Sequence, residues 1–169
     1  MRKTGAEKIG YGKWSKKGVP HKGWTCVDYE DFGEMSFECE MCEFKMIRYI
    51  HHMEHPEYPD VLRVGRVCAE NMEDDYSGAK KREAFLKSRI KKRDRWVERK
   101  WKISKNGNDW IEADGYIVIV MEQNYCWKAV IKNKDETFKK WSEGEYNSPD
   151  EIKLAAFDCI TDILKEQML

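Results

Sequence analysis

Long apolar runs are missing from this 169-residue chain. The longest uninterrupted one, residues 116–121, falls far short of the roughly 20 residues that cross a bilayer. The N-terminal residues also lack the apolar core of a signal peptide. We therefore expect a cytoplasmic protein without a membrane partner.

Net charge is also missing, because 31 basic residues balance 31 acidic ones. The charges are nevertheless segregated: residues 1–24 carry +6, residues 25–79 carry −10, residues 80–105 carry +10 and residues 106–169 carry −6. Seven Trp, eight Tyr and six Phe exclude general disorder. We expect an α+β protein with a basic flexible arm (1–23), a zinc-binding module (24–76), a basic amphipathic linking helix (77–105) and a C-terminal module (106–169).

Six cysteines without a targeting segment are better explained as metal ligands and buried thiols than as disulfides. Cys39 and Cys42 have the two-residue spacing that lets one turn direct two thiolates at an ion. Cys68 stands where a helix can begin, near the positive end of its dipole. These three, with one histidine, predict a tetrahedral Cys3His zinc site in a treble-clef-like finger.

The histidine is one of two neighbours, His51 and His52. Side chains alternate along a strand, so the two cannot both face one ion. Cys26 is the reserve fourth ligand, whereas Cys126 and Cys159 have no spaced partner and are expected to be buried thiols. A zinc ion in this acidic module with few apolar residues is expected to be structural.

The segment from Gly23 onwards also resembles a group of poorly characterised zinc-finger proteins of bacteria and phages. The resemblance rests on Gly-Trp-Thr-Cys at 23–26, Cys-x-x-Cys at 39–42, Ile-Arg-Tyr-x-His at 47–51, His-Pro-x-Tyr at 55–58 and Val-Gly-x-x-Cys-Ala at 64–69. It implies the zinc ligands Cys39, Cys42, His51 and Cys68, with Gly65 supplying the turn before the last of them. It implies no reaction.

Two basic segments are candidates for contact with nucleic acid or an acidic partner. Residues 80–102 predict a long helix, because Leu86, Ile90, Val97 and Trp101 recur at helical spacing among cations, and Phe85 and Trp96 widen this apolar stripe. The arm combines lysines with the spaced aromatics Tyr11, Trp14 and Trp24, a pattern suited to phosphates and bases. Alternatively, it docks Trp24 onto the module that follows. The binding residues proposed are Lys91, Lys92, Arg93, Arg95 and Arg99 on the helix, and Lys13, Lys16 and Lys17 on the arm.

The C-terminal module reads as three antiparallel strands and a helix. The strands are expected at 116–122, 126–132 and 137–141, and Ser148-Pro-Asp-Glu151 predicts a capped helix start. This order resembles ethylene-response and integrase arm-type DNA-binding domains, whose sheet enters the major groove, although a net charge of −6 opposes simple DNA reading. Lys128, Lys132, Lys139 and Lys140 can form a local basic face.

These observations favour a non-enzymatic zinc-finger accessory protein that binds nucleic acid through its arm and helix. The alternative is an adaptor that docks onto a nucleoprotein complex of a mobile element or of phage or bacterial defence. An HNH-like nuclease is the third hypothesis; no downstream Asn–His pair supports it. A homodimer is compatible with the sequence but does not follow from it.

Overall fold

The computed structural model describes residues 10–169, which divide into two compact units after Ser88. Both units mix helices with antiparallel sheets, as an α+β fold requires. The division falls inside one helix, α3 (Gly78–Asp94), so its first part belongs to unit 1 and its last turns to unit 2.

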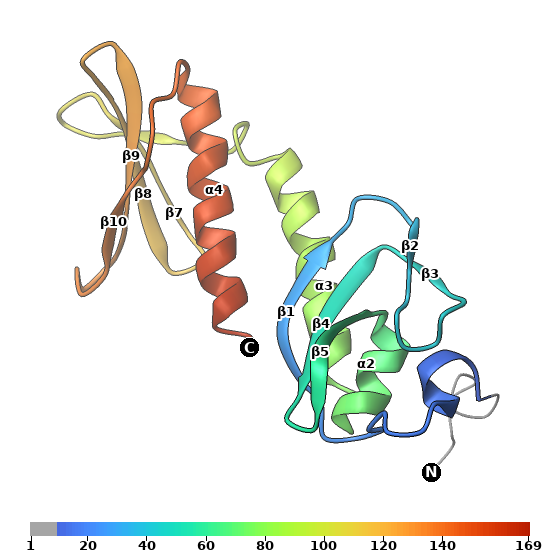
Figure 1. Ribbon diagram of the computed structural model, residues 1–169. Coiled ribbons are helices and arrows are strands. Elements are labelled where there is room, and N and C mark those ends of the chain that lie inside the picture. The colour runs from blue at the N-terminus through green and yellow to red at the C-terminus, as the bar shows by residue number, and fades with distance from the viewer. Residues whose placement is uncertain (1–9) are drawn as a thin grey trace. The chain divides into compact units, whose positions relative to one another are not determined.

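Unit 1 is built on a three-stranded sheet of order β1-β4-β5. The strands are β1 (Thr25–Asp31), β4 (Tyr49–His55) and β5 (Tyr58–Val64), and α2 (Arg66–Glu73) follows directly (Figure 1). Buried Ile50, Met53 and Leu62 supply its aliphatic core. The first part of α3 packs on this sheet, since the Phe85 ring meets Tyr29 edge-on at 6.2 Å.

Residues 10–23 are not the free arm that their composition predicts. They contain a short 3-10 helix, η1 (Gly12–Ser15), and the Lys13 N–H donates to the Met41 carbonyl at 2.8 Å. Trp14 and Trp24 are both buried, so neither indole is presented to a ligand. The alternative in which this segment docks on the module therefore describes residues 10–24, and residues 1–9 lie outside the described part.

The linking helix ends at Asp94, well before the predicted residue 102. Residues 95–99 continue as turns, because Trp96 enters the core of unit 2 and its Nε1 donates to the Lys153 carbonyl at 2.7 Å. Trp101 packs against it with ring centroids 5.5 Å apart. Apolar residues that matched a helical stripe thus serve as anchors for a turn.

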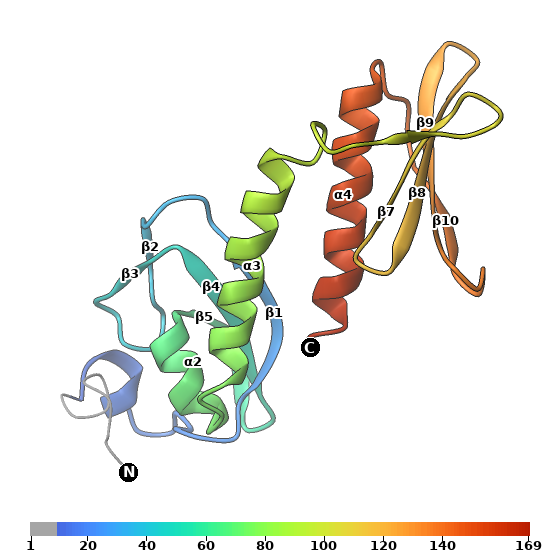
Figure 2. The same cartoon turned by 180° about the vertical axis from the view of Figure 1, so that it is seen from behind.

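Unit 2 holds five antiparallel strands, not three, in the order β10-β9-β8-β7-β6. They are β6 (Lys102–Ile103), β7 (Asp109–Ala113), β8 (Tyr116–Gln123), β9 (Cys126–Asn133) and β10 (Lys139–Trp141). The two additional strands are short, and β7 buries only Ile111, which gives little alternation to recognise. The predicted final helix is present as α4 (Pro149–Glu166) and lies along one face of the sheet (Figures 1 and 2).

The core of unit 2 lies between α4 and the inner sheet face. Val118, Val120 and Ile131 meet Ile152 and Phe157 there. The predicted cap of α4 is confirmed, because the Ser148 hydroxyl accepts from the Glu151 N–H at 3.2 Å and Pro149 opens the helix. No helix among residues 10–169 is long and apolar enough to span a membrane.

Candidate metal centre and sheet face

The Cys39–Cys42 turn joins two short strands, β2 (Phe37–Glu38) and β3 (Met46–Ile47). The Cys39 N–H donates to the Lys45 carbonyl and the Glu43 N–H donates to the Cys39 carbonyl, each at 2.8 Å. Glu43 has a positive φ of 55°, which reverses the chain after the second cysteine. The turn thereby points both sulfurs to the same side.

Cys68 reaches the same place from the first turn of α2. Gly65 precedes that helix, and its N–H donates to the Cys39 sulfur at 3.5 Å. A Cβ at Gly65 would lie 2.7 Å from the Ile47 side chain, so only glycine lets the helix start approach the turn this closely. The close approach places the third sulfur beside the first two.

The Sγ atoms of Cys39, Cys42 and Cys68 lie within 4.8 Å of one another and all three residues are buried. Sulfurs that share a tetrahedral zinc ion are about 3.8 Å apart, from a Zn–S bond of about 2.3 Å. The three cysteines are thus close enough to bind a metal ion. No other Cys, His, Asp or Glu among residues 10–169 belongs to this cluster.

The pKa values of these thiols are set by their contacts. The Cys39 pKa falls to about 5, because its sulfur accepts from the Cys68 thiol and from backbone N–H groups, including that of Gly65. The same contact with Cys39, together with burial, raises the pKa of Cys68, and burial raises that of Cys42. One thiolate is therefore already favoured in the folded chain, which suits a site for a cation.

Residues 10–16 close over the back of the Cys39–Cys42 turn. Lys13 donates through Nζ to the Glu40 carbonyl and to Glu43, each at 2.8 Å. A Cβ at Gly12 would lie 2.6 Å from the Cys42 carbonyl, so this backbone contact also requires glycine. Trp14 Nε1 is buried, and its contact with the Cys68 thiol lowers the pKa of Cys68 against the larger effects that raise it.

His51, the fourth predicted ligand, is not part of the sulfur cluster. It lies opposite Tyr29 and Val64 on the sheet, and its Nδ1 accepts from Arg82 Nε at 3.3 Å. Burial, followed by the nearby Arg82 charge, lowers the His51 pKa to about 3, so the ring is neutral. His52 points elsewhere, with Nε2 2.8 Å from Glu30.

Cys26, the reserve ligand, also lies apart from the cluster. Its thiol donates to the Asp28 carbonyl at 3.1 Å, and burial raises its pKa to about 11. Cys126 and Cys159 are half-buried. The structure thus brings together three of the four predicted ligands, and strand alternation correctly separated His51 from His52 without showing which core His51 would enter.

The predicted nucleic-acid-binding cations are scattered, and several already have acidic partners. Lys13 and Lys16 both contact Glu43, at 2.8 and 2.9 Å. Lys92 pairs with Asp114, and Arg93 makes a two-point contact with Asp158 at 2.7 and 2.9 Å. Arg99 lies over the Trp96 ring, whereas Lys17, Lys91 and Arg95 are exposed and take part in none of these contacts.

A face that sequence reasoning only partly found lies on the sheet of unit 2, opposite α4. Cross-strand pairing aligns one row across all five strands, Lys102, Trp110, Ile119, Val130 and Trp141. The next rows add Lys132 and Lys139, and Lys128 beside Met121. We call these residues the outer sheet face.

The outer sheet face combines aromatic rings with ammonium groups. Lys102 Nζ lies 4.6 Å from the Trp110 ring centroid, and Lys139 Nζ lies 5.5 Å from that of Trp141. Trp141 is 47% exposed. The alternation of side chains along β8 and β9 is the sequence signal that could have revealed this face. Every second side chain of these strands points away from α4, and these side chains are polar or aliphatic.

Comparison of the chain with models of protein families, with curated proteins and with solved structures gives no match.

Proposed function

We propose that this chain is a nucleic-acid-binding protein in which unit 1 is a structural zinc finger of the treble-clef type and unit 2 makes the main contact. A two-cysteine turn, a hairpin and a ligand in the first helical turn match the treble-clef plan. Three buried sulfurs without an evident catalytic base support a structural metal.

The observation that carries nucleic-acid binding is the outer sheet face. The exposed indole of Trp141 and the half-buried indole of Trp110 can stack on bases, and the lysines beside them can contact phosphates. Glu143, Asp162 and Glu166 of this unit line a hollow beside α4, whereas Glu112 lies in the same cross-strand row as Lys132 and Lys139. The outer sheet face is therefore richer in lysine than the net charge of −6 suggests. This assignment replaces the predicted helix surface, whose Lys92 and Arg93 are occupied by Asp114 and Asp158.

The test compares two sets of charge removals with the same net change. One variant carries Lys→Gln at 102, 128 and 139 on the outer sheet face; the control carries Gln at Lys87, Lys91 and Arg95 on or directly after α3. Affinity for single- and double-stranded DNA is measured against salt concentration. We expect the slope of log affinity against log salt to fall by about 2 to 3 in the first variant only, about 0.7–0.9 per lost phosphate contact.

An equal loss in the control would return the binding surface to the helix, and no binding by the parent at low salt would reject the proposal. Trp141→Ala adds a second readout, because loss of a stacking platform should weaken binding by roughly 1–3 kcal/mol per base without changing the salt slope.

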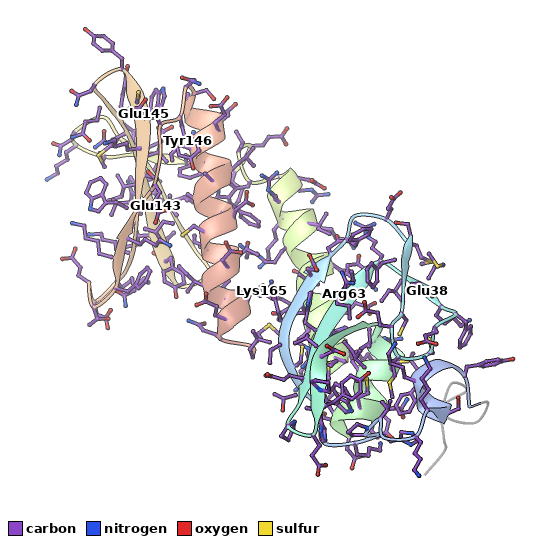
Figure 3. All side chains as sticks on the ribbon, in the orientation of Figure 1. Glu38, Arg63, Glu143, Glu145, Tyr146 and Lys165 are labelled. Atoms are coloured by element: carbon purple, nitrogen blue, oxygen red, sulfur yellow. The ribbon has the colours of Figure 1, made fainter. Side chains whose placement is uncertain are left out.

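The adaptor alternative is supported by a different observation. A cavity of about 530 Å³ lies between β10 and α4, with an apolar floor of Ile131 and Phe138 and the acidic rim already described. Glu143 and Tyr146 come from the segment that connects β10 to α4 (Figure 3). Such a hollow suits a basic, partly apolar peptide; Asp162→Asn together with Glu166→Gln should abolish salt-sensitive binding of a Lys-rich peptide.

No observation supports the nuclease hypothesis. Of the four histidines, His51 is buried beside Arg82, His52 contacts Glu30, and His55 packs its ring 5.3 Å from that of Trp24. His21 contacts Trp14 in the same manner. Across residues 10–169, the sulfur cluster is the one group of three or more potential ligands.

A further inference from the structure

The sulfur cluster supplies one ligand fewer than a closed tetrahedral site needs. Structural zinc sites take four protein ligands, whereas three leave a position for an external donor. Residues 1–9 contain neither Cys nor His, and the remaining Cys and His residues of unit 1 lie outside the cluster. The cluster therefore differs from the predicted Cys3His site, in which the chain supplies all four ligands.

The open side of the cluster faces a cavity of about 470 Å³. Cys39, Cys42 and Cys68 all line it, as do Gly65 and Ile47. Its rim is formed by Phe44, Met46 and Val67, which are 41%, 46% and 41% exposed. Exposed apolar side chains around buried sulfurs form an entrance that a ligand with an apolar body can enter.

The chemistry of the lining defines the donor. Three thiolates favour a soft fourth ligand. A fourth thiolate would bring the charge of a zinc–sulfur group to −2, which Lys45 on the lining can offset; Arg66, also on the lining, is shared with Glu70 and Glu83 at 4.0 and 3.7 Å. The lining contains no His, Asp or Glu to act as a general base, which disfavours hydrolysis at this position.

We propose that the metal centre of unit 1 takes an external thiolate as its fourth ligand, received through the cavity beside Lys45 and Arg66. This inference rests on the proposed metal centre. Binding breaks the S–H bond of the incoming thiol, forms one sulfur–metal bond and releases one proton to the buffer, with no change of oxidation state. A free small thiol and a cysteine side chain of a partner share this chemistry.

The experiment uses the full-length chain loaded with Co²⁺ under a thiol-free reductant. Metal stoichiometry is measured first, and 2-mercaptoethanol is then titrated, with ethylene glycol as the matched hydroxyl control. We expect thiolate-to-cobalt absorption to rise saturably by about one third, as three thiolates become four. One proton should be released per thiol bound, and ethylene glycol should change neither signal.

Failure of the inference is distinguishable from failure of the metal centre. No bound cobalt would reject the centre itself. Stoichiometric cobalt with no response to thiol would overturn the external ligand, and so would four thiolates in the untreated parent. A change in the cobalt d–d bands of the untreated protein on His51→Gln would assign the fourth position to His51 instead.

Two variants test the proposed charge selection. Lys45→Met and Arg66→Met should each weaken thiol binding by up to about fivefold while cobalt remains bound. Lys81→Met, an exposed charge change elsewhere in the same unit, should leave it unaltered. A cysteine-containing peptide as titrant then separates the two sources, since tighter binding than 2-mercaptoethanol identifies a protein cysteine and equal or weaker binding identifies a small thiol.

Discussion

The two units differ in the kinds of side chain that they bury. Unit 2 buries a continuous apolar layer between α4 and its sheet, with Trp96 and Phe157 at the centre. Unit 1 relies more on polar and sulfur groups: its interior contains His51, Asn71 and Arg82 in addition to the three clustered cysteines. Unit 2 also buries Arg89 and Lys153, but the thiol cluster lies in unit 1, so a metal ion is expected to matter there and not in unit 2.

The largest effect should come from Cys39→Ser. Zinc binding in small finger domains contributes an apparent 10–16 kcal/mol, or about the whole stability of a domain. We expect the variant to lose metal and unit 1 to unfold, while the α4–sheet core of unit 2 persists. Residue-resolved NMR of the parent, with and without a chelator, and of the variant measures this.

Cys26→Ser is the matched control, because Cys26 is buried in the same unit but outside the cluster. It should retain the metal. If the reduced parent protein, kept free of chelators, contains no zinc, a metal ion does not account for the difference between the two units.

The substitution Phe157→Ala should destabilise unit 2 and leave unit 1 folded. Phe157 is buried, packs its ring 5.1 Å from that of Trp96, and carries the Arg89 guanidinium 4.0 Å from its centroid. Its truncation should lower the free energy of unfolding of unit 2 by about 3–5 kcal/mol. Denaturant unfolding followed by tryptophan fluorescence measures the loss, and cobalt absorption should show unit 1 still loaded.

Tyr125→Ala provides the neutral comparison, since Tyr125 is 96% exposed. Simultaneous loss of the metal in Phe157→Ala would mean that the two units fold as one, contrary to the division at Ser88.

A pH-dependent effect sharpens the comparison. His51 has a pKa of about 3 in the folded chain, lowered mainly by burial, against an ordinary value of 6.5. Below about pH 6.5 the His51 ring is protonated in the unfolded chain, whereas it stays neutral in the folded chain down to about pH 3. The free energy of unfolding therefore falls with falling pH over this range, by about 1.4 kcal/mol per pH unit. We expect unit 1 of the parent to show this extra slope relative to His51→Gln at saturating metal.

Metal release from the cysteines affects parent and variant alike and cancels in the difference. Equal slopes in the two proteins would show that His51 is solvated or charged in the folded state. Unit 2, which contains no histidine, supplies an internal reference.

Local patterns predicted the elements whose signals lie within one segment. The Ser148–Glu151 cap and the apolar stripe of α4 are such signals, as are the alternation of β8 and the spacing of Cys39 and Cys42. Each depends on hydrogen bonds or periodicity over a few residues.

Predictions that depended on distant partners were less successful. Trp96 and Trp101 matched a helical stripe, but their burial against Lys153 and each other ended α3 at Asp94. Trp14 looked available to a ligand until the Lys13–Met41 hydrogen bond placed residues 10–16 against the cysteine turn. Periodicity carries no information about which surface an apolar side chain will meet.

The sequence by itself determined the local features: two cysteines on one turn, a third at a helix start, and a C-terminal helix with one apolar face. Only the tertiary structure decided that Gly65 brings Cys68 to that turn, that His51 meets Arg82 and not the sulfurs, and that Trp110 and Trp141 share one face with lysines. The physical reason is range: spacing specifies contacts along one element, whereas a site is assembled by packing between elements far apart in the chain.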